Sequence, residues 1–127
     1  MSAILGYPQG NAWMELFIGD KKLLRAIEDD SLSGRYGAAM AKKILLRLAA
    51  LRAAESLADF WPPKSGPERC HELIGDLAGT FSVDVKQPYR LLFKPIEEAP
   101  PKDRSDEKKR WESITSIDIL AIENTHE

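Results

Sequence analysis

The chain has 127 residues, enough for one domain with little room for a second. A hydrophobic content of 43% indicates a folded core, and the single cysteine, Cys70, excludes an internal disulfide framework. No apolar run approaches the roughly 20 residues that span a bilayer, and the first residues lack a signal-peptide pattern. We therefore expect a cytoplasmic protein without a membrane partner.

The net charge of −2 does not by itself indicate a nucleic-acid-binding protein, but the charges are unevenly distributed. Residues 1–95 carry 13 basic and 11 acidic side chains, whereas residues 96–127 carry 5 and 9. One stretch without acidic residues holds five basic side chains: Arg35, Lys42, Lys43, Arg47 and Arg52. A local positive surface of this kind binds phosphates even in a slightly acidic chain, although a solvated helix face explains it equally well.

The first half of the chain predicts a strand followed by two helices. Residues 1–13 have no clear period and are expected to be a flexible leader or extension, or a segment absent if translation starts at Met14. A single domain then covers residues 14–127, opening on a short apolar strand. Asp20 is the expected N-cap of a first helix, with a break at 31–34. A second helix is expected over 36–56, where apolar residues recur at helical spacing: Met40, Ile44, Leu48 and Leu51.

The second half predicts extended structure, because short alternating runs replace the helical period. Strands are expected at 69–73, 80–85, 89–94 and 114–122, with Ile117, Ile119 and Ala121 on one face of the last. Residues 96–112 are rich in Pro, Glu, Asp and Lys and predict a charged, solvated loop. The fold class is therefore α+β, with two N-terminal helices on one side of an antiparallel sheet of about four to five strands, mixed at one edge.

The two histidines, His71 and His126, and the intervening Arg90 are the candidate catalytic residues. Cleavage of RNA without a metal ion needs a base for the 2′-hydroxyl, an acid for the leaving 5′-oxygen and a cation for the charged phosphorane. Histidine serves both proton roles near neutral pH, and arginine offers a bidentate fork to phosphate. The alternative is a structural or incidental His71, a solvent-facing Arg90 in a strand and a frayed tail at His126.

Residues 69–83 resemble the R-x-H-x-L-x-G-x-x-x-G-x-x-S-V signature of HigB-like toxins, also called plasmid maintenance killer proteins. Residues 89–93 (YRLLF) resemble a strand shared across the RelE superfamily, and residues 119–126 resemble the last strand and terminal D-Y-H of the family. The resemblance covers about 14–126 and implies a RelE-like fold. It implies a type II toxin that cuts mRNA on the ribosome through the substrate's 2′-hydroxyl, with no metal or organic cofactor.

Carried over position by position, the resemblance assigns catalysis to His71, Arg90 and His126. It also implies an adjacent HigA-like antitoxin with a helix-turn-helix domain, through which the toxin reaches promoter DNA. The residues expected to contact RNA phosphates are basic: Arg35, Lys42, Lys43, Arg47 and Arg69. Cys70 has no supporting groups for a nucleophile and is expected to be structural. Trp61 is expected to fill the core, whereas Trp111 is compatible with either the core or base stacking.

Asn124 and Thr125 depart from the Asp-Tyr that precedes the last histidine in the family. The change removes one carboxylate and one aromatic ring that stacks on a base. It leaves open a non-catalytic module on the same scaffold, either a gyrase inhibitor like the related ParE-type toxins or an inactive toxin retained to bind its antitoxin.

Overall fold

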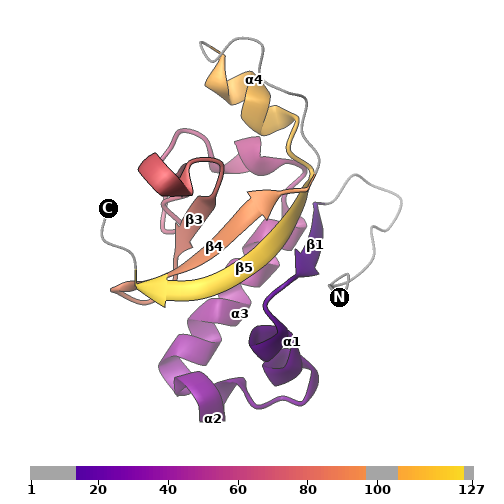
Figure 1. Ribbon diagram of the computed structural model, residues 1–127, viewed down its shortest axis with the longest axis vertical. Coiled ribbons are helices and arrows are strands. Elements are labelled where there is room, and N and C mark those ends of the chain that lie inside the picture. The colour runs from indigo at the N-terminus through magenta and orange to yellow at the C-terminus, as the bar shows by residue number, and fades with distance from the viewer. Residues whose placement is uncertain (1–13, 97–105, 125–127) are drawn as a thin grey trace.

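The structure, a computed structural model, describes residues 14–96 and 106–124 (Figure 1). The expected leader at 1–13 and the candidate His126 lie outside the described residues. Where the chain is described, none of its helices is both long and apolar enough to cross a membrane.

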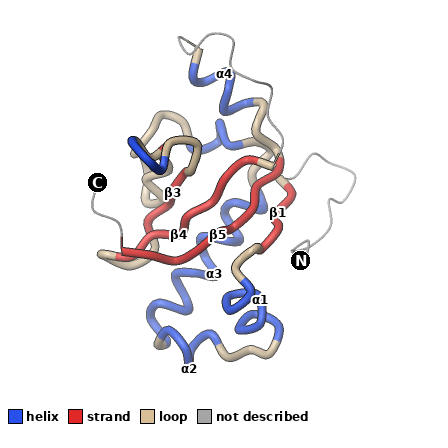
Figure 2. Tube along the Cα trace, viewed as in Figure 1, coloured by secondary structure: helices blue, strands red, loops and turns tan. Residues whose placement is uncertain are grey.

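Five strands form one mixed sheet in the order β1-β5-β4-β3-β2, as Figure 2 shows in red. Their bounds in chain order are β1 Glu15–Ile18, β2 His71–Glu72, β3 Phe81–Asp84, β4 Tyr89–Pro95 and β5 Ser116–Asn124. β1 pairs in parallel with β5, and the other neighbours are antiparallel. The predicted α+β class, with a sheet mixed at one edge, is confirmed.

The helical layer contains one helix more than the sequence predicts. The helices are α1 (Lys21–Glu28), α2 (Leu32–Tyr36) and α3 (Ala38–Ala53). Asp20 caps α1 by accepting hydrogen bonds from the backbone N–H groups of Lys22 and Leu23, as expected. The break after α1 falls at 29–31 rather than at the predicted 31–34, because Leu32 is buried and anchors α2. A second break falls at Gly37, whose φ of 86° suits glycine best.

The core lies between the sheet and the helical layer, and α3 passes behind the sheet in Figure 1. Ile44, Leu48 and Leu51 on α3 are buried as predicted, while Met40 is only half-buried. The sheet contributes alternate residues to this core, including Phe81, Val83, Leu91, Phe93, Ile117 and Ile119. The residues between them therefore lie on the outer face of the sheet.

A β-bulge changes which side chain of β5 faces the core. Leu92 pairs with Ala121, but Phe93 pairs with Ile119, so Leu120 is the extra residue. The alternation shifts by one residue there. Ile122, rather than the predicted Ala121, consequently packs against the core.

Part of the predicted charged loop is a helix. α4 (Glu107–Glu112) begins after Asp106, whose Oδ1 accepts a hydrogen bond from the N–H of Lys109 at 3.1 Å. Trp111 is 1% exposed and packs edge-to-face with Trp61 and Phe81. Trp111 is therefore a core residue. The solvated-loop prediction is wrong over 107–112 because one buried aromatic and a cap outweigh the local charge.

A short 3₁₀ helix, η1 (Leu57–Phe60), follows α3, and a second, η2 (Gly75–Leu77), lies between β2 and β3. The segment from 61 to 70 joins η1 to β2 and contains Arg69, which has a positive φ of 47°. This segment carries several residues of the candidate site.

Candidate functional site

The ladder registers place His71 and Arg90 on the same outer face of the sheet. His71 pairs with Ser82, and Ser82 pairs with Leu92. Asp84 pairs with Arg90 two residues further along. Two strand spacings and two residues of rise separate the Cα atoms of His71 and Arg90 by about 12 Å. The long arginine side chain spans part of that distance, so both groups can address one phosphodiester and its flanking riboses.

Asp84 organises the cationic part of this face. The Nε of Arg69 lies 3.4 Å from Oδ2 of Asp84, and the Nε of Arg90 lies 3.4 Å from Oδ1. Gln87 donates from Nε2 to Oδ2 at 3.3 Å. Two guanidinium groups and one carboxylate leave a net positive charge around a group that is only 7% exposed. This local charge fits a phosphate.

The Arg69 and Arg90 side chains differ in exposure, 49% against 14%. Arg69 is therefore open to solvent, as a phosphate contact requires, and Arg90 is held more firmly in the sheet. Sequence reasoning missed Asp84. The signal was available, because Asp84 and Arg90 lie three residues before and after Gln87, at positions that a turn centred on Gln87 pairs across the hairpin.

His71 is held by the backbone of the preceding segment. Its Nδ1 lies 2.8 Å from the carbonyl oxygen of Arg69. A carbonyl oxygen only accepts, so Nδ1 donates in this hydrogen bond. The bond orients the ring and leaves proton exchange with a substrate to Nε2. His71 as a whole residue is 5% exposed, so little of its surface is open to a substrate.

A cavity of about 380 Å³ lies beside His71. Its lining comes from four segments and combines aromatic, aliphatic and charged side chains: Trp61, Pro63, Lys64, His71, Glu72, Ile74, Glu107 and Trp111. Arg110 of α4 donates from Nη1 to Oε1 of Glu72 at 2.6 Å and so ties α4 to β2 at this cavity. His71 therefore lines a cavity whose wall is mostly apolar.

Arg47, a predicted phosphate contact, is buried beneath the sheet. It is 9% exposed, and its Nε donates to the backbone oxygen of Asp84 at 2.6 Å. Its Nη2 donates to the backbone oxygen of Pro67 at 3.3 Å. The position lies on the buried stripe of α3, three residues after Ile44, and the helical spacing already indicated this. From the helical side of the sheet, Arg47 therefore holds the backbone at Asp84 and Pro67 in place.

The other predicted phosphate contacts on the helices, Arg35, Lys42 and Lys43, are exposed, and Arg52 is half-buried. They lie in the helical layer, whereas His71 and Arg90 lie on the opposite face of the sheet. The structure thus separates the predicted basic residues into two groups. Arg69 alone among them joins the candidate catalytic residues.

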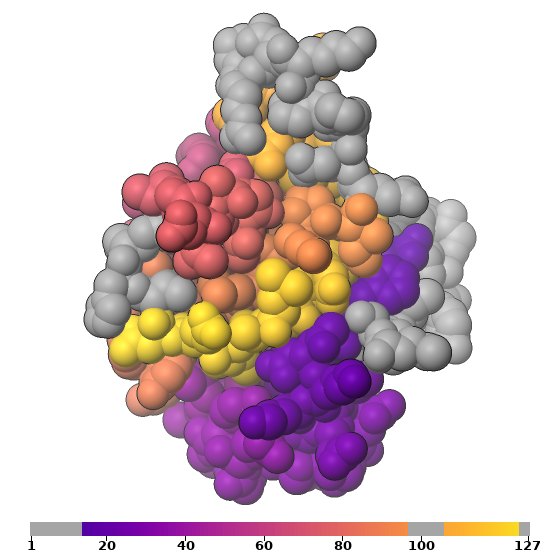
Figure 3. Space-filling model, viewed as in Figure 1, coloured from indigo at the N-terminus to yellow at the C-terminus, as the bar shows by residue number. Residues whose placement is uncertain are grey.

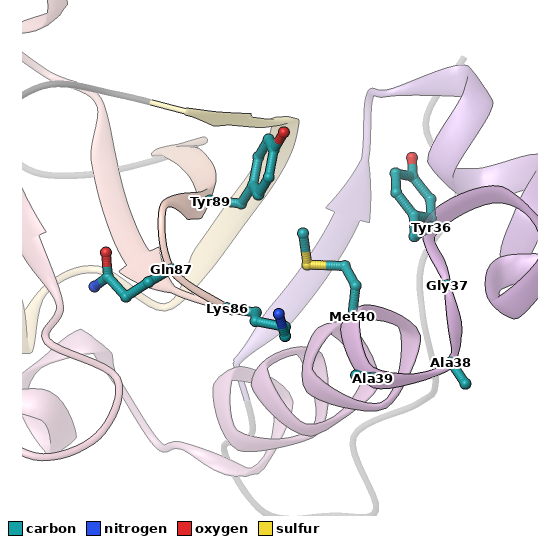
Figure 4. A pocket seen from close by; sticks show the side chains of 8 residues that line it. All are labelled: Tyr36, Gly37, Ala38, Ala39, Met40, Lys86, Gln87 and Tyr89. Carbon is teal, nitrogen blue, oxygen red and sulfur yellow. The ribbon is translucent and has the colours of Figure 1, made fainter.

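A second cavity of about 350 Å³ lies on the helical side of the sheet, between the start of α3 and the β3–β4 turn (Figure 4). Tyr36, Met40, Lys86 and Tyr89 are among its lining residues. Burial, and then the nearby charge of Asp20, raise the pKa of the Tyr36 hydroxyl, while Arg35 lowers it. This cavity contains none of the predicted catalytic residues.

Cys70 is completely buried, and burial followed by the charge of Glu68 raises the pKa of its thiol far above the ordinary value. A thiol held protonated is not a nucleophile, as the sequence indicated. Within 14–96 and 106–124, no three or more His, Cys, Asp or Glu side chains cluster as metal ligands.

The fold is similar to solved toxin structures. The YoeB dimer from Staphylococcus aureus has a TM-score of 0.51 at 16% identity, over 91% of this chain and 100% of that one. A YoeB/ParE toxin from Agrobacterium tumefaciens has a TM-score of 0.46 at 18% identity, over 87% and 98%. The YoeB–YefM complex from Staphylococcus aureus has a TM-score of 0.48 at 17% identity, over 89% and 98%.

The chain has the fold of RelE/YoeB-type toxins. The likeness to the YoeB structure with the TM-score of 0.51 concerns the fold alone, and it confirms the fold that the sequence predicts. No family model matches the sequence, and no curated protein matches it either. The narrower resemblance to HigB-like toxins stays a prediction.

Proposed function

We propose that this chain is the toxin of a type II toxin–antitoxin pair and cleaves mRNA on the ribosome without a metal ion. The observation that carries the proposal is the contact of 2.8 Å between Nδ1 of His71 and the carbonyl oxygen of Arg69, which orients the ring. A proton-accepting Nε2 then shares one sheet face with the guanidinium of Arg90, the pair that phosphodiester cleavage needs.

In the proposed reaction a base removes the proton of the substrate 2′-hydroxyl, and the resulting oxygen attacks the adjacent phosphorus. The bond from phosphorus to the 5′-oxygen breaks, and an acid gives that oxygen a proton. The products are a 2′,3′-cyclic phosphate and a 5′-hydroxyl end. Arg90 stabilises the phosphorane, with Arg69 at its exposed side.

His71 and His126 are the proposed proton-transfer pair. His126 lies outside the described residues, so its part of the proposal rests on the resemblance of residues 119–126 to the last strand of the family. The strand that leads to it ends at Asn124, which pairs with Tyr89 beside Arg90. The chain therefore leaves the sheet next to the candidate site.

The exposed Arg35, Lys42 and Lys43 are proposed to contact ribosomal RNA rather than the cleaved strand. They lie in the helical layer, on the opposite side of the sheet from His71. A toxin bound to the ribosome is surrounded by RNA. A second basic face can therefore contact RNA phosphates there without reading the sequence.

The proposed partner is a HigA-like antitoxin with a helix-turn-helix domain, and the pair binds its own promoter DNA through that domain. Support for this comes from the signature over residues 69–83. Neutralisation is tested by co-expressing the neighbouring gene product and measuring growth.

A non-catalytic module remains the second candidate, and two observations favour it. His71 is only 5% exposed, and Arg90 forms an ion pair with Asp84. In that function Arg69, Asp84 and Arg90 hold the sheet together, and the chain binds gyrase or its antitoxin.

The test is primer extension on mRNA from cells that briefly express the chain, beside a His71→Asn variant. Asparagine places an amide N–H near the position of Nδ1, so the bond to Arg69 is kept, while nothing replaces Nε2. Cuts in translated regions with 5′-hydroxyl ends, lost in a folded His71→Asn protein, support the nuclease. Absence of cuts from the folded parent chain supports the binding module.

A further inference from the structure

We propose that the cavity beside His71 binds a single nucleobase of the RNA, the one next to the cleaved phosphodiester, and thereby sets sequence preference. The inference rests on the proposed function and adds a base-binding site to it. Five residues carry it: Trp61, Pro63, Lys64, Ile74 and Glu107.

The volume of the cavity and the position of His71 in its wall suit a small planar ligand. The cavity volume of about 380 Å³ lies near the lower end of the range of about 300–1,000 Å³ for small-molecule sites. His71 forms part of the wall, so a base in the cavity belongs to a nucleotide close to the candidate catalytic residues. A distant nucleotide of the same strand does not fit this geometry.

The apolar lining suits the flat face of a base. Trp61 is half-buried at the wall, and Ile74 at the rim is 74% exposed. Ile74, Trp61 and Pro63 together give the cavity an apolar surface that is open to solvent at Ile74. Bases of every kind stack on such surfaces in single-stranded RNA sites.

The charged lining distinguishes one base from another. The carboxylate of Glu107 accepts hydrogen bonds, and Lys64 donates them. Carboxylates accept from the exocyclic amino groups of adenine, cytosine and guanine, whereas uracil has no amino group. The cavity is therefore expected to favour an amino-bearing base over uracil.

The cavity is held in shape without a ligand. The N–H of Lys64 donates to the carbonyl oxygen of Cys70 at 3.0 Å, and the N–H of Arg69 donates to that of Ser65 at 3.2 Å. Trp61 packs edge-to-face on Trp111 with ring centroids 5.1 Å apart. A site formed in advance loses less conformational entropy on binding.

The first experiment maps cleavage in cells for the parent chain and for an Ile74→Trp variant, which fills the opening of the cavity. Ile74 has an extended backbone and an exposed side chain, so the substitution leaves the fold intact. The matched control is Leu46→Trp, another exposed aliphatic residue, on α3. The expected result is a loss of base preference at the cut and roughly tenfold weaker cleavage at the preferred base in Ile74→Trp alone.

The second experiment measures binding without cleavage. RNA trinucleotides with 2′-O-methyl groups and a central A, C, G or U are titrated while the indole N–H signals of Trp61 and Trp111 are followed by NMR. Signals shifted by amino-bearing bases, and at least roughly tenfold weaker binding in Ile74→Trp, support the site even if the chain cuts no mRNA.

The experiments distinguish a failure of the base-binding site from a failure of the proposed nuclease. A chain that cuts mRNA with the same base preference in Ile74→Trp and Leu46→Trp overturns the base site and leaves the proposed nuclease standing. An Ile74→Trp variant with unchanged cleavage that escapes its antitoxin overturns the base site in favour of a protein partner. No cuts together with no trinucleotide binding overturns both.

Discussion

Arg110 donates from Nη1 to Oε1 of Glu72 at 2.6 Å, and the other carboxylate oxygen of Glu72 accepts from the backbone N–H of Gly79 at 2.8 Å. The guanidinium of Arg110 also lies over the ring of Phe81, 5.4 Å from its centroid. These contacts attach α4, which comes late in the chain, to the short edge strand β2 that carries His71. The charged segment before β5 thus supports the candidate site.

Replacing Arg110 by methionine is expected to lower the free energy of unfolding by about 2–4 kcal/mol, because the carboxylate of Glu72 stays buried without its charged partner. Urea denaturation measures the change, with Lys109→Met on the exposed face of α4 as the matched control. Adding Glu72→Gln to Arg110→Met should restore part of the loss, since no buried charge remains. Equal unfolding energies for Arg110→Met and Lys109→Met would show that the pair contributes nothing.

Neutralising Asp84 is expected to separate RNA binding from cleavage. In Asp84→Asn the outer face gains one positive charge, so the affinity for single-stranded RNA at low salt should rise. Cleavage should fall by at least about tenfold, because Arg69 and Arg90 lose the anion that orients them. Binding is measured by fluorescence anisotropy with 2′-O-methyl RNA, and cleavage by primer extension. Asp76→Asn, an exposed carboxylate in η2, removes the same charge; identical behaviour of the two variants would contradict the orienting role of Asp84.

Much of the fold follows from local sequence patterns, since the cap at Asp20, the apolar stripe of α3 and the alternation of 80–94 act over a few residues. The parallel pairing of β1 with β5 brings together residues about 100 positions apart, as in Leu16 with Ile117. Such pairing depends on the whole topology, and the sequence indicated only a mixed edge. The β-bulge at Leu120 is likewise set by the partner strand.

The candidate site was predictable in part. His71, Arg69 and Arg90 could be selected by residue type and resemblance. The ladder places His71 and Arg90 on one face, and an ion pair joins Arg69 to Asp84 on that face. Arg47 could not be distinguished from Lys43 by charge, because its partners are two backbone carbonyls from distant segments. The cavity beside His71 could not be predicted from the sequence either, since it forms where segment 61–64, the start of η2 and α4 meet.

The thiol of Cys70 is expected to react with a thiol reagent only after unfolding, because the side chain is buried and its pKa is raised. It is the sole cysteine, so Ellman's reagent reports on one site. The same shift predicts a stability change. The unfolded thiol loses its proton near its ordinary pKa of 9.0 while the folded thiol keeps it, so the folded state binds more protons above that pH.

Stability should therefore fall as the pH rises above about 9, by up to about 1.4 kcal/mol per pH unit from this group. Urea denaturation at pH 8.0, 9.0 and 10.0 measures the slope, and Cys70→Ala should remove this contribution. A slope unaltered by Cys70→Ala would assign the pH dependence to other groups.

Arg47 and Lys43 should behave oppositely although both are basic residues of α3. Arg47→Met is expected to lower the free energy of unfolding by about 1.5–3 kcal/mol, because the carbonyl oxygens of Asp84 and Pro67 lose a charged donor. Lys43→Met should change it by less than about 0.5 kcal/mol, since Lys43 is exposed.

Lys43 is also proposed to contact a ribosomal phosphate. In a plot of the logarithm of ribosome affinity against the logarithm of salt concentration, Lys43→Met should then lower the slope by about one unit. Sedimentation binding to ribosomes at several salt concentrations checks this, and an unchanged slope for Lys43→Met would remove Lys43 from the proposed RNA surface.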